Sequence, residues 1–547
     1  MINRVLNSQT KTITGAAIVL AVSAVLSGFL GLIRDRLLAA TFGAGIETSI
    51  YFAAFRVPDL VYNILILGGI LVTFLPLFSE YFSENKKEAW QMTNYVLNAF
   101  LILLVLVCLI LFLLAPLFVK VITPGFAEKD KATVVALTRI LFLSPIFFGI
   151  ANIFSGILHY FNCFLAYSIA PLLYNIGIIL GIIFLTPYFN IFGAGIGVVF
   201  GAFLYLFIQI PSAIHQGFEY KFLVNFKYPA LKRIFFLMVP RACGVVANQI
   251  NLIVITAIAS TITIGSIAIF NFSNNLQGMA ASVFGVSLAT AVFPTFSKLL
   301  ANGQKKEFAE KFSSLLRQTL FLIVPVSVLM LLLRAQIVRL VLGAGRFDWE
   351  DTRLTAASLG LFSLSIFAST LIPFIARAFF SLKDTKTPAL VTIISVTVNA
   401  MLSFLFVRLL AFSNFFSEFL KFLLKVQNIK NISMIGLPLA FSIAAILQFI
   451  LLLYFLQKRI GDFRVKEVSS SLKKILVASF LMAIFVYLSL QFASMLVNMQ
   501  TFLGVFLQTT FASFVGFCVY ILATNALGSS EVRNIKYLIL RQLSGLH

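Results

Sequence analysis

Long apolar runs separated by short polar segments form the main pattern of this chain. Fourteen of these runs are about 20 residues or longer, which is the length that a helix needs to cross the hydrocarbon core of a bilayer. The runs are continuous rather than alternating, so they predict helices and not the strands of a barrel. The predicted membrane-spanning helices are 13–33, 50–82, 94–120, 134–158, 166–186, 191–213, 234–257, 266–297, 318–343, 355–380, 388–411, 432–456, 474–494 and 502–525.

Two of these runs, 50–82 and 266–297, are long enough to tilt strongly or to contain a break. The first run follows Arg4 and Lys11 and continues into Arg34-Asp35-Arg36. Because it is too long for the apolar region of a signal peptide, we expect it to be retained as the first helix.

Composition agrees with an all-α integral membrane protein. The chain has 547 residues, of which 60% are hydrophobic and only 11% charged. In soluble domains about a quarter of all residues are charged. The net charge of +22 would suggest nucleic acid in a soluble protein. Here the charges lie in short loops, and no basic groove with aromatic residues and no zinc spacing accompanies them, so we predict no nucleic-acid partner.

The distribution of Lys and Arg predicts the orientation in the membrane. An even number of spans places both termini on one side, and 25 of the 41 Lys and Arg residues fall on that side. Cytoplasmic loops carry the excess of these residues. We therefore predict a multi-pass protein of the bacterial cytoplasmic (inner) membrane with both termini in the cytoplasm.

The loop 412–431 lies on the opposite side and has an amphipathic pattern. Glu418, Lys421 and Lys425 share one face of a helix, and phenylalanines and leucines fill the other face. This pattern favours a helix that lies flat on the membrane surface. The alternative is a helix that caps the bundle.

The chain partly repeats itself at an offset of about 218 residues. Leu75-Pro76-Leu77-Phe78-Ser79 precedes a Lys-Lys-Glu sequence, and so does Phe293-Pro294-Thr295-Phe296-Ser297. Six spans fit in that interval, so the two halves would enter the membrane in the same sense, as in parallel repeats. The pattern predicts two pseudo-symmetric six-helix lobes (1–225 and 226–460) around a central cavity, followed by two C-terminal helices and a tail (461–547). Coincidence between short apolar strings is the alternative.

No motif for nucleotide binding or catalysis is present. The sequence has no GxxxxGK[ST] or HExxH, and its three histidines are dispersed. We predict a protein that is not an enzyme, has no cofactor and binds no metal. Active transport would then depend on the membrane potential or an ion gradient.

The first candidate motif runs from Gly28 to Gly45 and contains Arg34 and Asp35. Gly28 and Gly31 would allow close helix approach, and adjacent residues on a helix point about 100° apart. A charge inside a membrane is a functional hypothesis by default, and guanidinium binds phosphate with two parallel hydrogen bonds. The alternative is that Arg34 extends to the interface at a helix end.

The second candidate motif is Pro240-Arg241 through Asn251. Arg241 and Asn248, with Gln249 or Asn251, would form a polar stripe on an apolar helix. Asn274 and Asn275 lie with other polar residues near the start of the next span. Cavity lining and hydrogen bonding between helices are the two interpretations for all these amides.

Taken together, these motifs resemble the lipid II flippase family (MurJ, also called MviN) of the multidrug/oligosaccharidyl-lipid/polysaccharide exporter superfamily. The residues that carry the resemblance are Arg34-Asp35 through Gly45, Phe55-Arg56-Val57-Pro58-Asp59, Pro240-Arg241 through Asn251, Gly285-Val286 through Phe293-Pro294, Gly345-Arg346-Phe347 and Asp384-Thr385-Lys386-Thr387-Pro388.

The resemblance implies a fourteen-helix fold and movement of undecaprenyl-diphosphate-linked disaccharide-pentapeptide from the inner to the outer leaflet by alternating access. It implies that Arg34, Asp35, Arg56 and Arg241 line a polar cavity. The expected substrate-binding residues are therefore Arg34, Asp35, Arg56, Arg241, Asn248, Gln249, Asn274 and Asn275. The expected partners are the lipid-linked diphosphate sugar, membrane lipids and the cell-wall synthesis machinery.

The chain departs from well-studied members at several positions where they carry charges, namely Gly28, Ser49, Tyr62, Asn63, Leu67, Asn274 and Asn275. A cavity with fewer charges keeps a second hypothesis open, a flippase for another lipid-linked oligosaccharide of the O-antigen or capsule type. A cation-coupled drug exporter and a scaffold without transport activity are further alternatives. A drug exporter for cationic drugs would favour acidic cavity residues over arginines.

Overall fold

The computed structural model describes residues 13–529 and 531–532, apart from the side chains of 13–14, 16–18, 67–69, 71–72, 237, 239–244, 283–284 and 286–291. The chain forms two compact units. The first contains the residues up to Ala268 and the short segment Ala344–Phe347, and the second contains Ile269–Gly343 and the residues from Asp348 onwards. The predicted division into lobes at residues 225 and 460 stays a prediction, because it rests on the sequence repeat.

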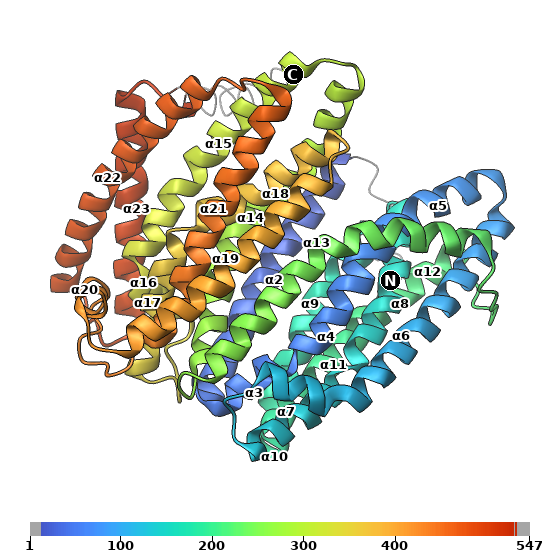
Figure 1. Cartoon of the computed structure of the whole chain (residues 1–547), viewed down its shortest axis with the longest axis horizontal. Coiled ribbons are helices and arrows are strands. Elements are labelled where there is room, and N and C mark those ends of the chain that lie inside the picture. The colour runs from blue at the N-terminus through green and yellow to red at the C-terminus, as the bar shows by residue number, and fades with distance from the viewer. Residues whose placement is uncertain (1–12, 530, 533–547) are drawn as a thin grey trace. The chain divides into compact units, whose positions relative to one another are not determined.

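The first unit is a bundle of helices (Figure 1). In it, α9 packs along α11 and α2, and α13 packs along η1. Its elements are α2 (Ile13–Phe42), α3 (Ile46–Ala54), α4 (Arg56–Val61), η1 (Tyr62–Ile70), α5 (Leu71–Glu84), α6 (Lys86–Ile122), α7 (Glu128–Leu141), α8 (Leu143–Tyr160), α9 (Phe164–Leu180), η2 (Gly181–Leu185), α10 (Thr186–Phe189), α11 (Ile191–Phe207), α12 (Ile210–His215) and α13 (Pro229–Ser260).

The predicted second span, 50–82, is broken in the structure. Helix α3 ends at Ala54, α4 begins at Arg56, and the π-helical segment η1 separates α4 from α5. Pro58 lies in the first turn of α4, where a missing N–H costs little. Of the two possibilities that the sequence left open, a tilt and a break, the structure shows an interruption in this run, whereas the other long run, 266–297, lies in the single helix α14 (Ser266–Ala301).

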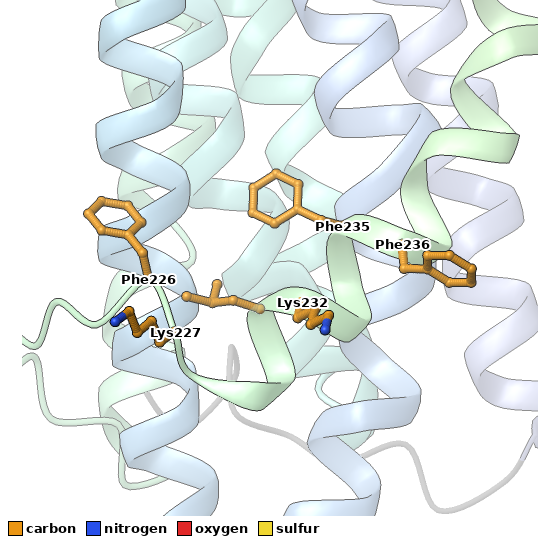
Figure 2. Close-up of a pocket in the computed structure, with 6 residues that line it drawn as sticks. Phe226, Lys227, Lys232, Phe235 and Phe236 are labelled. Atoms are coloured by element: carbon orange, nitrogen blue, oxygen red, sulfur yellow. The ribbon is translucent and has the colours of Figure 1, made fainter.

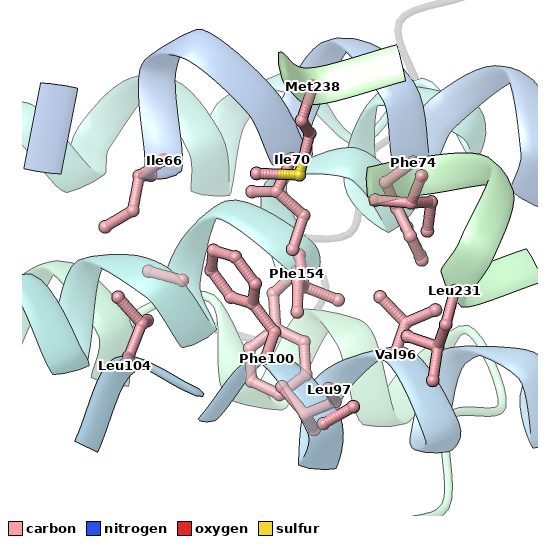
Figure 3. Packing of buried hydrophobic residues seen from close by; sticks show 14 of the residues in the cluster. Ile66, Ile70, Phe74, Val96, Leu97, Phe100, Leu104, Phe154, Leu231 and Met238 are labelled. Atoms are coloured by element: carbon pink, nitrogen blue, oxygen red, sulfur yellow. The ribbon is translucent and has the colours of Figure 1, made fainter. Parts of the chain in front are cut away.

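Apolar side chains from many helices fill the core of the first unit. Figure 3 shows residues of this core, in which Met238 of α13 lies next to Ile70, and Phe100, Phe154 and Phe74 belong to the same cluster. Such burial is the main favourable term within the bundle, because close packing maximises dispersion contacts. The core thus fixes the helices from which the polar residues of the site project.

Glycines let α9 and α11 approach closely. A Cβ atom on Gly177 would collide with the backbone of Gly201, so the contact needs a residue without a side chain. The expected close approach at Gly31 is not found, because a Cβ there would meet nothing within 4 Å. Spacing alone did not distinguish a glycine at a helix contact from one in open space.

The second unit is also a helical bundle with its own apolar core, which includes Phe312 stacked on Phe374 at 5.1 Å between ring centroids. Within it, α22 packs along α23 and α19 along α21. Its elements are α14, α15 (Lys305–Leu332), α16 (Arg334–Val341), α17 (Trp349–Ser363), α18 (Ile366–Ser381), α19 (Lys386–Ala411), α20 (Phe415–Leu424), η3 (Ser433–Ile435), α21 (Gly436–Ile460), α22 (Val465–Leu496) and α23 (Phe502–Ala526).

The helical, membrane-type fold that the sequence predicts is confirmed. Among the described residues, ten helices are long and apolar enough to cross a membrane, or eleven if the bent pair α17 and α18 forms one span. Three further predicted spans fall on α2, α13 and α14, and parts of these helices lie outside the described side chains. The count of fourteen therefore stays a prediction.

The amphipathic loop forms a short helix, as its pattern predicted. Helix α20 begins after Asn414, whose side chain accepts a hydrogen bond from the Ser417 N–H at 2.8 Å. Leu420 is buried against the unit, whereas Phe415 and Phe422 are exposed. One face of α20 thus packs on the bundle, and its aromatic face does not.

Candidate functional site

A polar pocket of about 300 Å³ lies inside the first unit. Helices α2, α4, α8, α9 and α11 and the segment η1 contribute to it. The residues around it are Ser27, Arg34, Phe55, Pro58, Asp59, Tyr62, Ser144, Pro145, Phe148, Pro171, Tyr174, Asn175 and Tyr205. A pocket of mixed aromatic and polar lining within an apolar bundle is a candidate binding site.

Arg34 is the charged donor of this pocket. Its Nη2 lies 2.8 Å from Oδ1 of Asp35, its Nε donates to the same oxygen at 3.0 Å, and its Nη1 donates to Oδ1 of Asn175 at 3.2 Å. Helix α2 continues to Phe42, so Arg34 is not at a helix end and does not extend to the interface there. Arg34 and Asp35 leave the helix in different directions, but the long arginine side chain folds back onto its neighbour and forms an ion pair that the sequence did not predict.

The guanidinium of Arg34 keeps hydrogen-bonding capacity. It has five N–H groups, and the three bonds to Asp35 and Asn175 leave one N–H on each terminal nitrogen without a protein partner in the described part of the chain. Its side chain is 24% exposed, whereas that of Asp35 is 6% exposed. Two free N–H groups on neighbouring nitrogens match two oxygens of one phosphate.

Asn175 holds Arg34 in this position. Its side-chain oxygen accepts from Arg34, and its Nδ2 donates to the Ser27 hydroxyl at 3.2 Å. The amide therefore joins α9 to two sites on α2. Asn175 is absent from the sequence-predicted site, since a single amide in an apolar span gives no signal that distinguishes it from any other helix contact.

Arg56 is buried beside the pocket but does not line it. Its Nε donates to the Thr256 hydroxyl of α13 at 2.8 Å, and it interacts electrostatically with Asp59, which does line the pocket. Buried charges are retained where they are paired and hydrogen-bonded. Arg56 thus has the position of a bracing residue rather than of a direct ligand.

The formal charges of Arg34, Asp35, Arg56 and Asp59 cancel. Attraction for an anion here depends on the free N–H groups of Arg34 and on the low dielectric around them, and not on a net positive charge.

Aromatic rings form the other wall of the pocket. Phe148 lies 5.0 Å from Tyr62, 5.2 Å from Tyr174 and 5.2 Å from Tyr205, measured between ring centroids. Edge-to-face and tilted contacts of this kind stabilise a rigid aromatic wall. Tyr62, at which the resemblance implied a departure from the family, contributes a neutral ring to this wall.

The remaining predicted residues do not join this pocket. Asn248 is exposed and Gln249 is buried on α13, and the pocket lining includes neither of them. Arg241 lies on α13 with its side chain outside the described residues. Asn274 and Asn275 belong to the second unit, where the Asn274 side-chain oxygen accepts from Gln277 at 3.2 Å.

Two distant motifs of the sequence meet in the first unit. The N–H of Arg346 donates to the carbonyl of Ala40 at 2.9 Å, and the Arg346 side chain lies 3.9 Å from Glu47. Gly345 has a φ of +57°, and a Cβ atom at this position would collide with the same Ala40 carbonyl. The segment Ala344–Phe347 is thus fixed at the end of α2, the helix that carries Arg34.

Comparison with known proteins gives consistent matches. A family model described as lipid II flippase MurJ matches residues 38–507. A probable lipid II flippase MurJ of Buchnera aphidicola subsp. Schizaphis graminum is 28% identical over 478 residues, which cover 86% of this chain and 88% of the relative. The lipid II flippase MurJ of Burkholderia cenocepacia is 24% identical over 398 residues, covering 71% of this chain and 77% of the relative.

Solved structures agree in fold. A lipid II flippase MurJ in an inward closed conformation matches with a TM-score of 0.74 and 25% identity, covering 93% of this chain and 98% of that chain. An inward-facing multidrug resistance MATE family transporter of the MOP superfamily matches with a TM-score of 0.65 and 13% identity, covering 82% of this chain and 99% of that chain. At that identity the second match concerns the fold alone.

Proposed function

Since this chain belongs to the lipid II flippase MurJ family, we propose that it moves lipid II from the inner to the outer leaflet of the bacterial inner membrane. The observation that carries the mechanism is Arg34, whose two free N–H groups lie at a pocket inside a membrane-type bundle. The family membership favours lipid II over another lipid-linked oligosaccharide as the substrate.

The substrate chemistry explains why such a pocket is needed. A lipid-linked sugar diphosphate has a polar headgroup that the hydrocarbon core excludes and a tail that remains in lipid. A guanidinium in a site of low dielectric offers charge-assisted hydrogen bonds to the diphosphate. These bonds replace part of the hydration that the headgroup loses, so the barrier to crossing is lowered while the tail stays outside.

Release of the headgroup requires that the pocket binds it less tightly in one conformation than in another. A site that bound the headgroup equally well in every conformation would shift no equilibrium. We therefore infer alternating access, in which the pocket is offered to one leaflet and then to the other. The sequence has no nucleotide-binding motif, which supports coupling to the membrane potential or an ion gradient.

Topology and partners complete the proposal. The bias of Lys and Arg supports cytoplasmic placement of both termini. The lipid-linked substrate and membrane lipids are the direct partners, and we infer functional contact with the enzymes of cell-wall synthesis that use the translocated substrate.

Complementation of a bacterial strain depleted of its own lipid II flippase tests the proposal. The wild-type chain is expected to restore growth, Arg34→Ala to fail, and Arg408→Gln to succeed as a matched control, because Arg408 lies over the Phe404 ring in the second unit. Arg241→Ala in the same strain tests the predicted role of that residue. Membrane levels of each variant are measured by immunoblot. Full rescue by Arg34→Ala would refute the role of the pocket. Failure of the wild type to rescue would refute lipid II as the substrate.

A further inference from the structure

A second surface of the first unit combines cationic and aromatic side chains. It is a hollow of about 650 Å³ at the start of α13, lined by Phe226, Lys227, Leu231, Lys232, Phe235 and Phe236. Figure 2 shows these residues around the turn that leads into the helix. We propose that this surface, the α13 entry surface, binds the headgroup of an anionic phospholipid, with its acyl chains along the phenylalanines.

The two lysines of this surface are available to an anion. In the described part of the chain neither Lys227 nor Lys232 forms an ion pair, although nearby cations do. Lys221 pairs with Glu219 at 3.4 Å, and Arg233 pairs with Glu80 at 2.9 Å. Glu219 and Glu80 are thus already paired, whereas Lys227 and Lys232 keep ammonium groups that a lipid phosphate can complement.

The phenylalanines at the same surface indicate an apolar environment rather than water. Phe226 is 64% exposed and Phe236 is 80% exposed. Exposed aromatic residues next to lysines are typical of the interface region of a membrane, where rings meet acyl chains and ammonium groups meet phosphates. A free phosphate would use the lysines and leave these rings in water.

The turn is held firmly enough to act as a preformed site. Leu231 and Ile234 are 3% and 2% exposed and belong to the core of the unit. Tyr228 stacks on Tyr95 with 4.6 Å between ring centroids. Because these inward residues fix the start of α13, the backbone that carries the lysines and phenylalanines has little conformational freedom to lose when a lipid binds.

The position in the chain fits the same interpretation. The apolar part of α13 follows directly after Lys232 and Arg233, so this surface lies where a membrane-spanning segment meets the polar headgroups. By the predicted orientation this is the cytoplasmic leaflet, whose anionic lipids attract such basic segments. The inference does not depend on the transport substrate.

Lipid binding to the purified full-length protein tests the proposal. Native mass spectrometry would count bound phosphatidylglycerol and phosphatidylcholine at matched concentrations for the wild type and for Lys227→Gln/Lys232→Gln. The double variant is expected to bind phosphatidylglycerol roughly 10- to 30-fold more weakly, given the usual contribution of two lysines, with phosphatidylcholine unchanged. The matched control Lys305→Gln/Lys306→Gln alters two exposed lysines elsewhere and should bind like the wild type.

The phenylalanines separate a lipid site from a phosphate site. Phe235→Ser/Phe236→Ser is expected to weaken phosphatidylglycerol binding while leaving the lysines in place. Equal phosphatidylglycerol binding by the wild type and the lysine variant would overturn the proposal. It would also be overturned if inorganic phosphate at millimolar concentration displaced the lipid fully. Thermal unfolding of each variant confirms that the fold is kept.

Discussion

The Nε atom of Arg56 donates a hydrogen bond to the hydroxyl of Thr256 at 2.8 Å, although the two residues are 200 positions apart in the chain. This contact joins α4, next to the pocket, to the last turns of α13. Arg56 is only 7% exposed, so its charge depends on partners such as Thr256 and Asp59. The family motif around Arg56 thus has a structural reason within this unit.

Replacing Thr256 by Val should destabilise the first unit by about 1–3 kcal/mol, because a buried charged donor loses its acceptor while the side-chain volume stays the same. Thr256→Ser keeps the hydroxyl and should remain close to the wild type. Thermal unfolding of the purified protein in detergent measures both. Equal midpoints for the valine and serine variants would contradict a bracing role for Arg56.

Replacing Asn175 by Leu should weaken binding of lipid II roughly tenfold, because Arg34 loses the acceptor that orients its Nη1, an interaction worth about 1.5 kcal/mol for a charged donor. The matched control is Asn152→Leu, since Asn152 is also buried but, among the described residues, its side chain bonds only to the Phe148 carbonyl of its own helix. Affinity is measured on the purified proteins. A similar loss in both variants would point to general misfolding instead.

Gly345→Ala should impair both stability and complementation. Gly345 and Gly303 both have a positive φ, +57° and +73°, but only Gly345 lies against another segment, at the Ala40 carbonyl. An alanine costs about 1–2 kcal/mol in that backbone conformation at either position, and at Gly345 it would also displace the segment from α2. Unfolding midpoints and rescue of the depleted strain should therefore show a larger defect for Gly345→Ala than for Gly303→Ala.

The carboxylate of Asp384, in the loop between α18 and α19, should make the stability of the folded protein depend on pH. Burial raises its pKa, but hydrogen bonds from the Thr387 N–H (3.0 Å) and hydroxyl (2.7 Å), together with Arg459, outweigh burial and lower the pKa overall. Because the folded pKa lies below the unfolded value of about 3.9, the carboxylate stabilises the fold above roughly pH 4, and this contribution is lost as the pH falls through the folded pKa.

Asp384→Asn should accordingly lower the unfolding midpoint at pH 7 by a few degrees. The difference from the wild type should narrow below about pH 4, since the wild-type carboxylate is then protonated too. A gap that is constant between pH 7 and pH 3 would contradict the assigned role of the charge.

Much of the fold could be predicted from the sequence, because apolar runs report directly on membrane-spanning helices. The break in 50–82 and the short helix at 415–424 follow from length and amphipathic pattern. The close contact of Gly177 with Gly201 could not be predicted, since many glycines in apolar spans look alike.

The site was predicted less completely than the fold. Arg34 and Asp35 were found because charges in an apolar run are rare, but their ion pair was missed, since helix angles describe Cβ directions and not the reach of a long side chain. Asn175 and the aromatic wall around Phe148 were missed because amides and aromatic residues are common in membrane helices. Their role appears only when α8, α9 and α11 are brought together.

Affinity of the purified protein for lipid II, compared between the wild type, Arg34→Lys and Arg34→Gln, tests the central claim most directly. We predict binding at least about tenfold weaker for Arg34→Gln, because a neutral amide cannot supply the charge-assisted pair of hydrogen bonds. Arg34→Lys should be intermediate, since it keeps the charge but not the two parallel donors. A folded Arg34→Gln protein that binds lipid II as tightly as the wild type would contradict the account.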